Sequence, residues 1–221
     1  MKLAWFLFFS CSMLAATIHC KCLIYGKYLP LSLPSKGKWA ISDTGVKPND
    51  QLLIVNEHNA LRKSVADGKV PGQPKAINMK PLKWDSKLAQ IAQSIANTCD
   101  YKHRKISDPR WWNVGQNIGK LESSTRLSQT YWSKFIMGWF NEHDNYHFTN
   151  HPIKGTGHYT QIVWADTEYV GCGYTNFRNS NSSIYVQFYV CNYGPGGNIN
   201  GMTPYQIEPL RPVNTIFTLT I

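Results

Sequence analysis

The sequence predicts an α+β fold in which helices pack on a small antiparallel sheet. Three segments in the first two thirds of the chain have helical periodicity in their apolar residues. Three later segments have the two-residue alternation of strands, and the short connections between them favour antiparallel pairing. With 221 residues, 43% of them hydrophobic, the chain is long enough for one large domain, and it has no internal repeat.

Three helices are expected before residue 146. The first begins at Asp50, an N-cap candidate, and ends in the glycine- and proline-rich residues 68–74. The second begins at the N-cap candidate Asp85 and ends at Cys99. The third spans about 128–145 and carries an apolar stripe more typical of a core than of a cofactor site. The stripe consists of Trp132, Phe135, Ile136, Trp139 and Phe140.

Strands are expected at residues 159–165, 170–175 and 184–192. His158 stands at the mouth of the first of these strands, directly after a glycine turn. A histidine in that place can face a cleft while the strand keeps its core side chains. Residues 114–119 are expected to form a glycine-flanked loop whose backbone passes close to another part of the protein.

The first residues are typical of a secretory signal peptide. Lys2 precedes the apolar residues 3–14, and cleavage is expected between residues 17 and 20. We therefore expect residues 1–20 to be a signal peptide, residues 21–49 to be an N-terminal extension, and the protein to be secreted. No other apolar run approaches the ~18 residues of a membrane span.

The charge pattern argues against a nucleic-acid partner. The formal net charge is +10, but the basic residues are scattered, and the densest group is residues 102–105. Such a protein is attracted weakly to anionic surfaces without carrying a basic arm.

A secreted protein keeps its disulfides, so the number of cysteines is informative. Cys172 and Cys191 flank two expected strands and are natural partners. Cys99 then needs Cys20 or Cys22, and we predict the pair Cys22–Cys99. Signal cleavage before Cys20 would leave one thiol unpaired. Asn181 begins the one N-glycosylation sequon, in a polar loop.

Standard catalytic motifs are missing from the sequence. There is no G-x-S-x-G elbow, phosphate loop or dinucleotide fingerprint. His143 and His147 have the spacing of a zinc-protease pair, but the expected helix ends near them, and Asp144 is a short replacement for the glutamate of that motif.

A scattered set of polar residues remains beside the glycine turns and aromatic helices. Two imidazoles and a carboxylate that meet in one cleft would hold a divalent ion, with water completing its shell. The set consists of His103, Gln116, Glu142 and His158.

Two long segments resemble the signatures of the CAP superfamily, which comprises cysteine-rich secretory, antigen-5 and plant pathogenesis-related proteins. They are residues 157–164 (GHYTQIVW) and 188–198 (FYVCNYGPGGN). Shorter similar blocks are residues 56–62, 82–85, 99–103 and 115–118. The resemblance covers about residues 50–207, and it is most similar to the arthropod antigen-5, or venom-allergen, branch.

The resemblance implies a three-layer α-β-α sandwich for residues 50–207, followed by a short tail, 208–221. It also implies that the four polar residues correspond to the family's cleft tetrad of two histidines and two acids. In that tetrad His103 and His158 would bind Zn²⁺ or another divalent cation. His58 matches a family block but not the tetrad, so we assign it to packing.

The chain departs from the family pattern at Gln116, where many relatives have glutamate. An amide carries no charge and cannot act as a base, so it weakens both metal affinity and any acid–base role. The additional disulfides usual in antigen-5 proteins also lack partners here.

We therefore expect a secreted, non-enzymatic antigen-5-like protein, acting as a venom or salivary allergen or an extracellular effector. A divalent cation is the expected ligand of the cleft. A small lipid or sterol is a second candidate ligand, with the aromatic stripe as its groove unless the stripe packs in the core. Host or receptor proteins are unidentified partners. The alternative is a metal-assisted hydrolase or protease that uses Glu142 as its base and the two histidines as ligands.

Overall fold

The computed structural model describes residues 39–179 and 181–209, all within one compact unit of the chain. The predicted signal peptide, residues 21–38 of the extension with Cys22, and nearly all of the tail lie outside the described residues.

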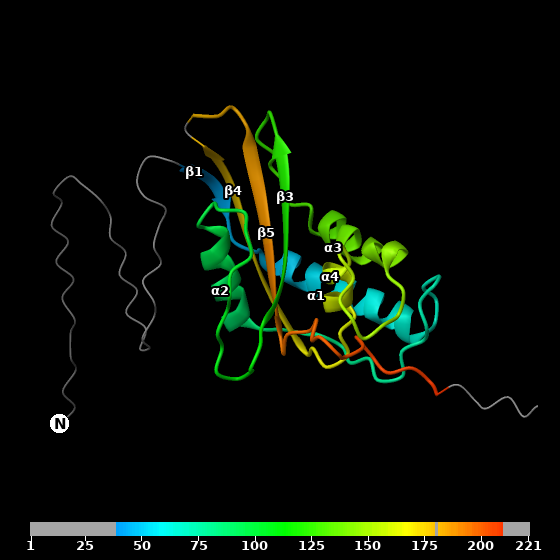
Figure 1. Cartoon of the computed structure of the whole chain (residues 1–221). Helices are drawn as coiled ribbons and strands as arrows, with labels where there is room; N and C mark the ends of the chain where they lie inside the picture. Colours follow the sequence, from blue (N-terminus) through cyan, green and yellow to red (C-terminus); the bar gives the residue numbers. More distant parts are fainter. Residues whose placement is uncertain (1–38, 180, 210–221) are drawn as a thin grey trace, which may run out of the picture. The chain divides into compact units, whose positions relative to one another are not determined.

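The sheet has the strand order β1-β4-β5-β3, and these neighbours pair antiparallel (Figure 1). The strands are β1 (Trp39–Thr44), β3 (Gly115–Ser123), β4 (Tyr169–Asn179) and β5 (Tyr185–Gly194). A two-residue strand, β2 (Lys83–Trp84), pairs in parallel with the start of β4.

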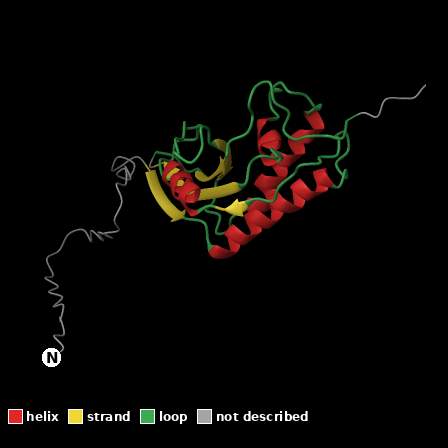
Figure 2. Cartoon of the chain, turned by 90° about the horizontal axis from the view of Figure 1, so that it is seen from below, coloured by secondary structure: helices red, strands yellow, loops and turns green. Residues whose placement is uncertain are grey.

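Helices cover both faces of this sheet. Helix α2 packs on β4 and β5 from one side, whereas α1, α3 and α4 form the layer on the other side (Figures 1 and 2). Their bounds are α1 (Pro48–Ala66), α2 (Ser86–Ala96), α3 (Trp132–Phe140), the 3₁₀ helix η1 (Asn141–Asn145) and α4 (Gly157–Ile162). The α+β class and the three-layer sandwich are confirmed.

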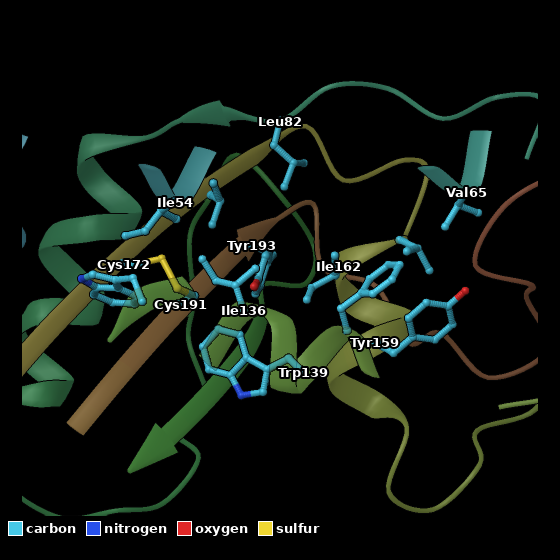
Figure 3. Packing of buried hydrophobic residues seen from close by; sticks show 14 of the residues in the cluster. Ile54, Val65, Leu82, Ile136, Trp139, Tyr159, Ile162, Cys172, Cys191 and Tyr193 are labelled. Carbon is cyan, nitrogen blue, oxygen red and sulfur yellow. A yellow bond between two sulfur atoms is a disulfide. The ribbon is translucent and has the colours of Figure 1, made fainter. Parts of the chain in front are cut away.

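Strand β5 divides the core into two clusters by its alternation. Phe188 and Val190 face α2 and pack with its alanines. Tyr189, Cys191 and Tyr193 face the opposite way, into the larger cluster beneath α1, α3 and α4. Figure 3 shows that cluster, with Trp139 and Tyr159 among the labelled side chains. Because both faces of the sheet are covered, residues 170–177 of β4 and 187–193 of β5 are buried.

The predicted pair Cys172–Cys191 is confirmed as a disulfide that joins directly opposed residues of β4 and β5. Cys99 lies buried on the α2 side of the sheet, where burial raises the pKa of its thiol to about 12. Its predicted partner Cys22 lies outside the described residues, so the Cys22–Cys99 pair stays a prediction.

The helix bounds differ from those expected. Helix α1 begins at Pro48, because proline is well suited to the first helical position, and its N-cap is Lys47. The prediction of Asp50 as N-cap was therefore wrong, and its carboxylate instead accepts the hydroxyl of Thr130. Asp85 is confirmed as the N-cap of α2 and accepts the backbone N–H of Leu88 at 2.7 Å. The third helix is shorter than expected and continues as η1.

The strand predicted at residues 159–165 was wrong, because residues 157–162 form helix α4. Its residues from Tyr159 onward are buried, so the apolar pattern of this six-residue segment could not separate a strand from a helix. Of residues 114–119, expected as a loop, all but Val114 belong to strand β3, which begins at Gly115. Their close approach is confirmed: a Cβ on Gly115 would overlap the side chain of Gln161, and one on Gly119 would overlap Phe135.

The aromatic stripe of α3 belongs to the core. Trp132, Ile136, Trp139 and Phe140 are buried, and the ring of Phe135 lies 4.2 Å from that of Tyr189. Of the two uses considered for this stripe, packing is the one that the structure shows.

Candidate metal centre

His158 lies in the first turn of α4, and Glu142 in η1 holds it there. The Nδ1 atom of His158 is 2.6 Å from Oε1 of Glu142. The other carboxylate oxygen, Oε2, accepts the backbone N–H groups of His158 and Tyr159 at 2.9 and 3.1 Å. Glu142 therefore fixes the histidine ring and also satisfies the unpaired N–H groups at the start of α4.

His103 is held in a similar way by Gln116 of β3. The Oε1 atom of Gln116 accepts the backbone N–H of Arg104 at 3.0 Å, and Nδ1 of His103 is 3.1 Å from the same oxygen. The Nε2 atom of Gln116 donates to Asn192 of β5, which fixes the orientation of the amide. These two contacts identify the atom that faces His103 as the amide oxygen of Gln116. An amide oxygen has no hydrogen to donate, so Nδ1 of His103 must be the donor and carries the proton.

These contacts leave both imidazoles prepared as metal ligands. A neutral histidine with its proton on Nδ1 has a free lone pair on Nε2, and an oxygen partner for Nδ1–H is the usual companion of a metal-binding histidine. The ring centroids of His103 and His158 lie 6.4 Å apart, and two imidazoles bound to one tetrahedral ion would be about 5 Å apart. A small movement of His103, which is exposed, would bring both rings to one ion.

The pair has no third ligand within the described part of the chain, where no group of three histidine, cysteine or carboxylate residues is positioned for an ion. The buried side chain of Trp139 packs against His158, with ring centroids 5.8 Å apart. An ion at this site would use two protein nitrogens and complete its shell with water.

The C-terminal end of α4 is held by a buried cation. Arg62 of α1 is 1% exposed, and its five N–H groups all donate to main-chain carbonyls. The acceptors are the carbonyls of Lys80, Ile162, Trp164, Ala165 and Thr167, at 2.7–3.3 Å. Burial lowers the pKa of this guanidinium to about 10, so it stays charged at neutral pH. An anion at one end of α4 and a cation at the other suit the helix dipole.

The structure thus brings together all four polar residues predicted for the cleft, on separate elements. Other residues around them were missed, namely Arg62, Asn117, Trp139 as a wall of the site, and Asn192. The only sequence signal for Asn117 was its position next to Gln116, in a segment expected to be a loop.

The remaining histidines considered from the sequence do not join the site. His58 is fully buried and bonded to Ile54 O and Tyr193 OH, which confirms its assignment to packing. The helix that a His143–His147 zinc site would require ends at Asn145, and the ring of His143 packs against Phe140 and Tyr159. The zinc-protease interpretation is therefore not supported.

Comparison with known protein families shows to which family the chain belongs. Residues 55–193 match the model of the cysteine-rich secretory protein family, CAP. The chain belongs to the CAP family. It is 35% identical over 198 residues to venom allergen 5 of Vespula vidua, an alignment that covers 86% of this chain and 93% of the relative. It is 36% identical over 177 residues to salivary antigen-5 of Triatoma infestans, covering 72% of each.

A solved CAP-type structure, that of NaASP2 with Zn²⁺, matches with a TM-score of 0.60 and 27% identity over 79% of this chain and 90% of that one. The resemblance to antigen-5 and venom-allergen proteins stated from the sequence is confirmed. Within the residues that the structure describes, no helix is long and apolar enough to cross a membrane.

Proposed function

We propose that this CAP protein is a secreted, non-enzymatic protein of the antigen-5 type that binds a divalent cation such as Zn²⁺ through Nε2 of His103 and His158. The observation that carries the proposal is the matched environment of the two rings: each Nδ1 faces an oxygen acceptor, so each Nε2 offers a lone pair.

The donor set also indicates how such an ion would be held. Two imidazoles leave positions for water, so we expect weaker binding than in a closed structural zinc site. The neutral amide of Gln116 adds no charge, whereas Glu142 supplies one anion behind His158. The structure of NaASP2 with Zn²⁺ supports zinc as the first ion to test.

Secretion is supported by the venom and salivary relatives and by the disulfide Cys172–Cys191, which suits an oxidising compartment. The predicted signal peptide would direct it there. Asn181 is exposed in the turn between β4 and β5, where a glycan would not disturb the sheet. A change in mobility after N-glycosidase treatment of the secreted protein, lost in Asn181→Gln, tests the glycan.

The metal proposal is tested by calorimetric titration of the purified protein with Zn²⁺. We expect one ion per chain, and at least a tenfold loss of affinity in His103→Ala and in His158→Ala. His147→Ala removes an exposed histidine that lies outside the site and serves as the matched control, with unchanged affinity. Equal affinity in wild type and His158→Ala would refute the site.

Metal-assisted hydrolysis, with Glu142 as the base, is less well supported. Three of the about four lone-pair positions of the Glu142 carboxylate already face N–H groups of His158 and Tyr159, and these hydrogen bonds make it a weaker base toward water. Peptidase activity that disappears in Glu142→Gln and His158→Ala would favour this alternative. Activity that persists in both variants arises elsewhere.

Binding of a small lipid or sterol stays a prediction. Since the aromatic stripe of α3 packs in the core, the described residues offer instead a pocket beside α4, lined by Ile153, Trp164, Ile199 and Met202 among others. Its volume is about 110 Å³, below the ~300 Å³ at which sites for drug-sized ligands begin. Sterol binding there would therefore require this region to open. A second pocket, of about 340 Å³, is large enough but is lined mainly by polar residues such as Asn78, Asp166 and Gln206. Mass spectrometry of the secreted protein for co-purified lipid tests this prediction.

A further inference from the structure

Strand β3 carries two neighbouring side chains that connect it to both histidines of the candidate centre. Gln116 holds the ring of His103. The next residue, Asn117, is 1% exposed, and its Nδ2 atom donates to the main-chain carbonyl of His158 at 3.1 Å. Because successive side chains of a strand point to opposite faces, one dipeptide reaches two elements that lie on different sides of it.

Asn117 is itself held by a buried chain of hydrogen bonds. Its Nδ2 atom is also 3.3 Å from the hydroxyl of Tyr193, which is 2.9 Å from Nε2 of His58. The other ring nitrogen of His58, Nδ1, is 2.8 Å from the carbonyl oxygen of Ile54 in α1.

The donor and the acceptor of each hydrogen bond in this series can be assigned from the groups at its ends. Burial lowers the pKa of His58 to about 4, so the ring is neutral at pH 7. A carbonyl only accepts, so Nδ1 of His58 carries the proton and Nε2 accepts from Tyr193. The Tyr193 oxygen then accepts from Asn117. The hydrogen bonds from Asn117 through Tyr193 to His58 and Ile54 therefore all have a consistent donor and acceptor, and they fix the Nδ2 group of Asn117.

We propose that Asn117 is a positioning residue of the metal site: it fixes the main chain of His158 where a small movement of His103 brings both rings to one ion. This inference rests on the proposed function. A site with two protein ligands depends strongly on their separation, because no third ligand corrects an error. Gln116 and Asn117 are consecutive residues of β3, so one short segment of this strand holds both histidines.

The test compares Zn²⁺ affinity in wild type and Asn117→Ala. We expect a 10- to 100-fold loss, the usual effect of removing a residue that orients a metal ligand. Asn176→Ala is the matched control. Asn176 is a fully buried asparagine of the same sheet, and its Nδ2 donates to the carbonyl of Leu127 at 2.9 Å, outside the site. It should lower stability to a similar extent and leave affinity within twofold.

A second comparison separates positioning from general loosening. In the His103→Ala background only one histidine remains, so there is no separation to set. Adding Asn117→Ala in this background should then change the residual Zn²⁺ affinity by less than twofold. NMR signals of the His158 ring measure that affinity. An equal loss in both backgrounds would overturn the inference.

A measurement without metal completes the test. We expect Asn117→Ala to speed amide hydrogen exchange in residues 157–163 of the apo protein, and Asn176→Ala to leave it unchanged. Asn117→Ser, whose short side chain cannot reach both acceptors, replaces Asn117→Ala should the latter not fold. If wild type binds no zinc, the proposed function fails. If wild type binds zinc and Asn117→Ala behaves as Asn176→Ala does, only the inference fails.

Discussion

Replacing Arg62 with methionine tests how the candidate site is supported. Methionine fills a similar volume but donates no hydrogen bond, so five main-chain carbonyls lose the guanidinium, four of them at the end of α4 and in the residues just after it. The Trp164 carbonyl still accepts the backbone N–H of Thr167, so four of the five carbonyls lose their partner. A buried carbonyl without a partner costs at least ~1 kcal/mol, which gives about 4 kcal/mol for the four carbonyls. Burying an apolar group in place of a charge returns part of this amount. We therefore expect the free energy of unfolding to fall by about 3 kcal/mol or more, a large share of the 5–15 kcal/mol typical of a domain.

The assay is denaturant unfolding with the disulfide intact, combined with hydrogen exchange. Arg62→Met should lower the midpoint and should speed exchange most strongly in residues 157–167. Arg62→Lys keeps a charge but has only three donors, so we expect an intermediate loss. Lys63→Met, at an exposed position on the same helix, is the control and should have no measurable effect. A loss below about 1 kcal/mol in Arg62→Met would refute this account of α4.

Three further predictions follow. Burial lowers the pKa of His58 to about 4 in the folded protein, whereas the unfolded chain binds a proton below pH 6.5. The free energy of unfolding should therefore fall by up to about 3 kcal/mol as the pH is lowered from 6.5 to 4. Denaturant unfolding at several pH values measures this fall, which should disappear in His58→Gln. Gly173→Ala should destabilise by about 2–4 kcal/mol because the new Cβ meets the backbone of α2, whereas Gly138→Ala, in an open helical position, should be neutral or stabilising in thermal melts. Gln116→Glu keeps the acceptor for His103 and adds a charge, so we expect calorimetry to show about tenfold tighter Zn²⁺ binding, and weaker binding would contradict this view of the centre.

Much of the fold could be predicted because local signals agreed with packing. Helix α2 has an N-cap, Asp85, and one apolar face. Strands β4 and β5 alternate and are joined by a short turn and a disulfide. Helix α4 could not be predicted, because a six-residue helix with buried sides has no readable period and depends on Glu142 and Arg62, which are distant in sequence. Strand β3 was hidden by its glycines, which are needed for close contact with Gln161 and Phe135.

The candidate site was predictable as a set of residues and not as a geometry. The family resemblance pointed to His103, Gln116, Glu142 and His158, although His158 was expected on a strand and lies on a helix. Sequence could not indicate that Glu142 accepts three N–H groups, or that Asn117 bonds to the His158 carbonyl. Those contacts join residues far apart in the chain, and only the packing of β3, η1 and α4 creates them.

The central claim is that two histidines from different elements form one cation site. A zinc-edge anomalous difference map from a crystal of the secreted protein soaked in Zn²⁺ tests it most directly. The account predicts one strong peak between the Nε2 atoms of His103 and His158, with Glu142 and Gln116 still bonded to the Nδ1 atoms. A map whose peaks lie only at other residues, with the two rings separated as before, would contradict it.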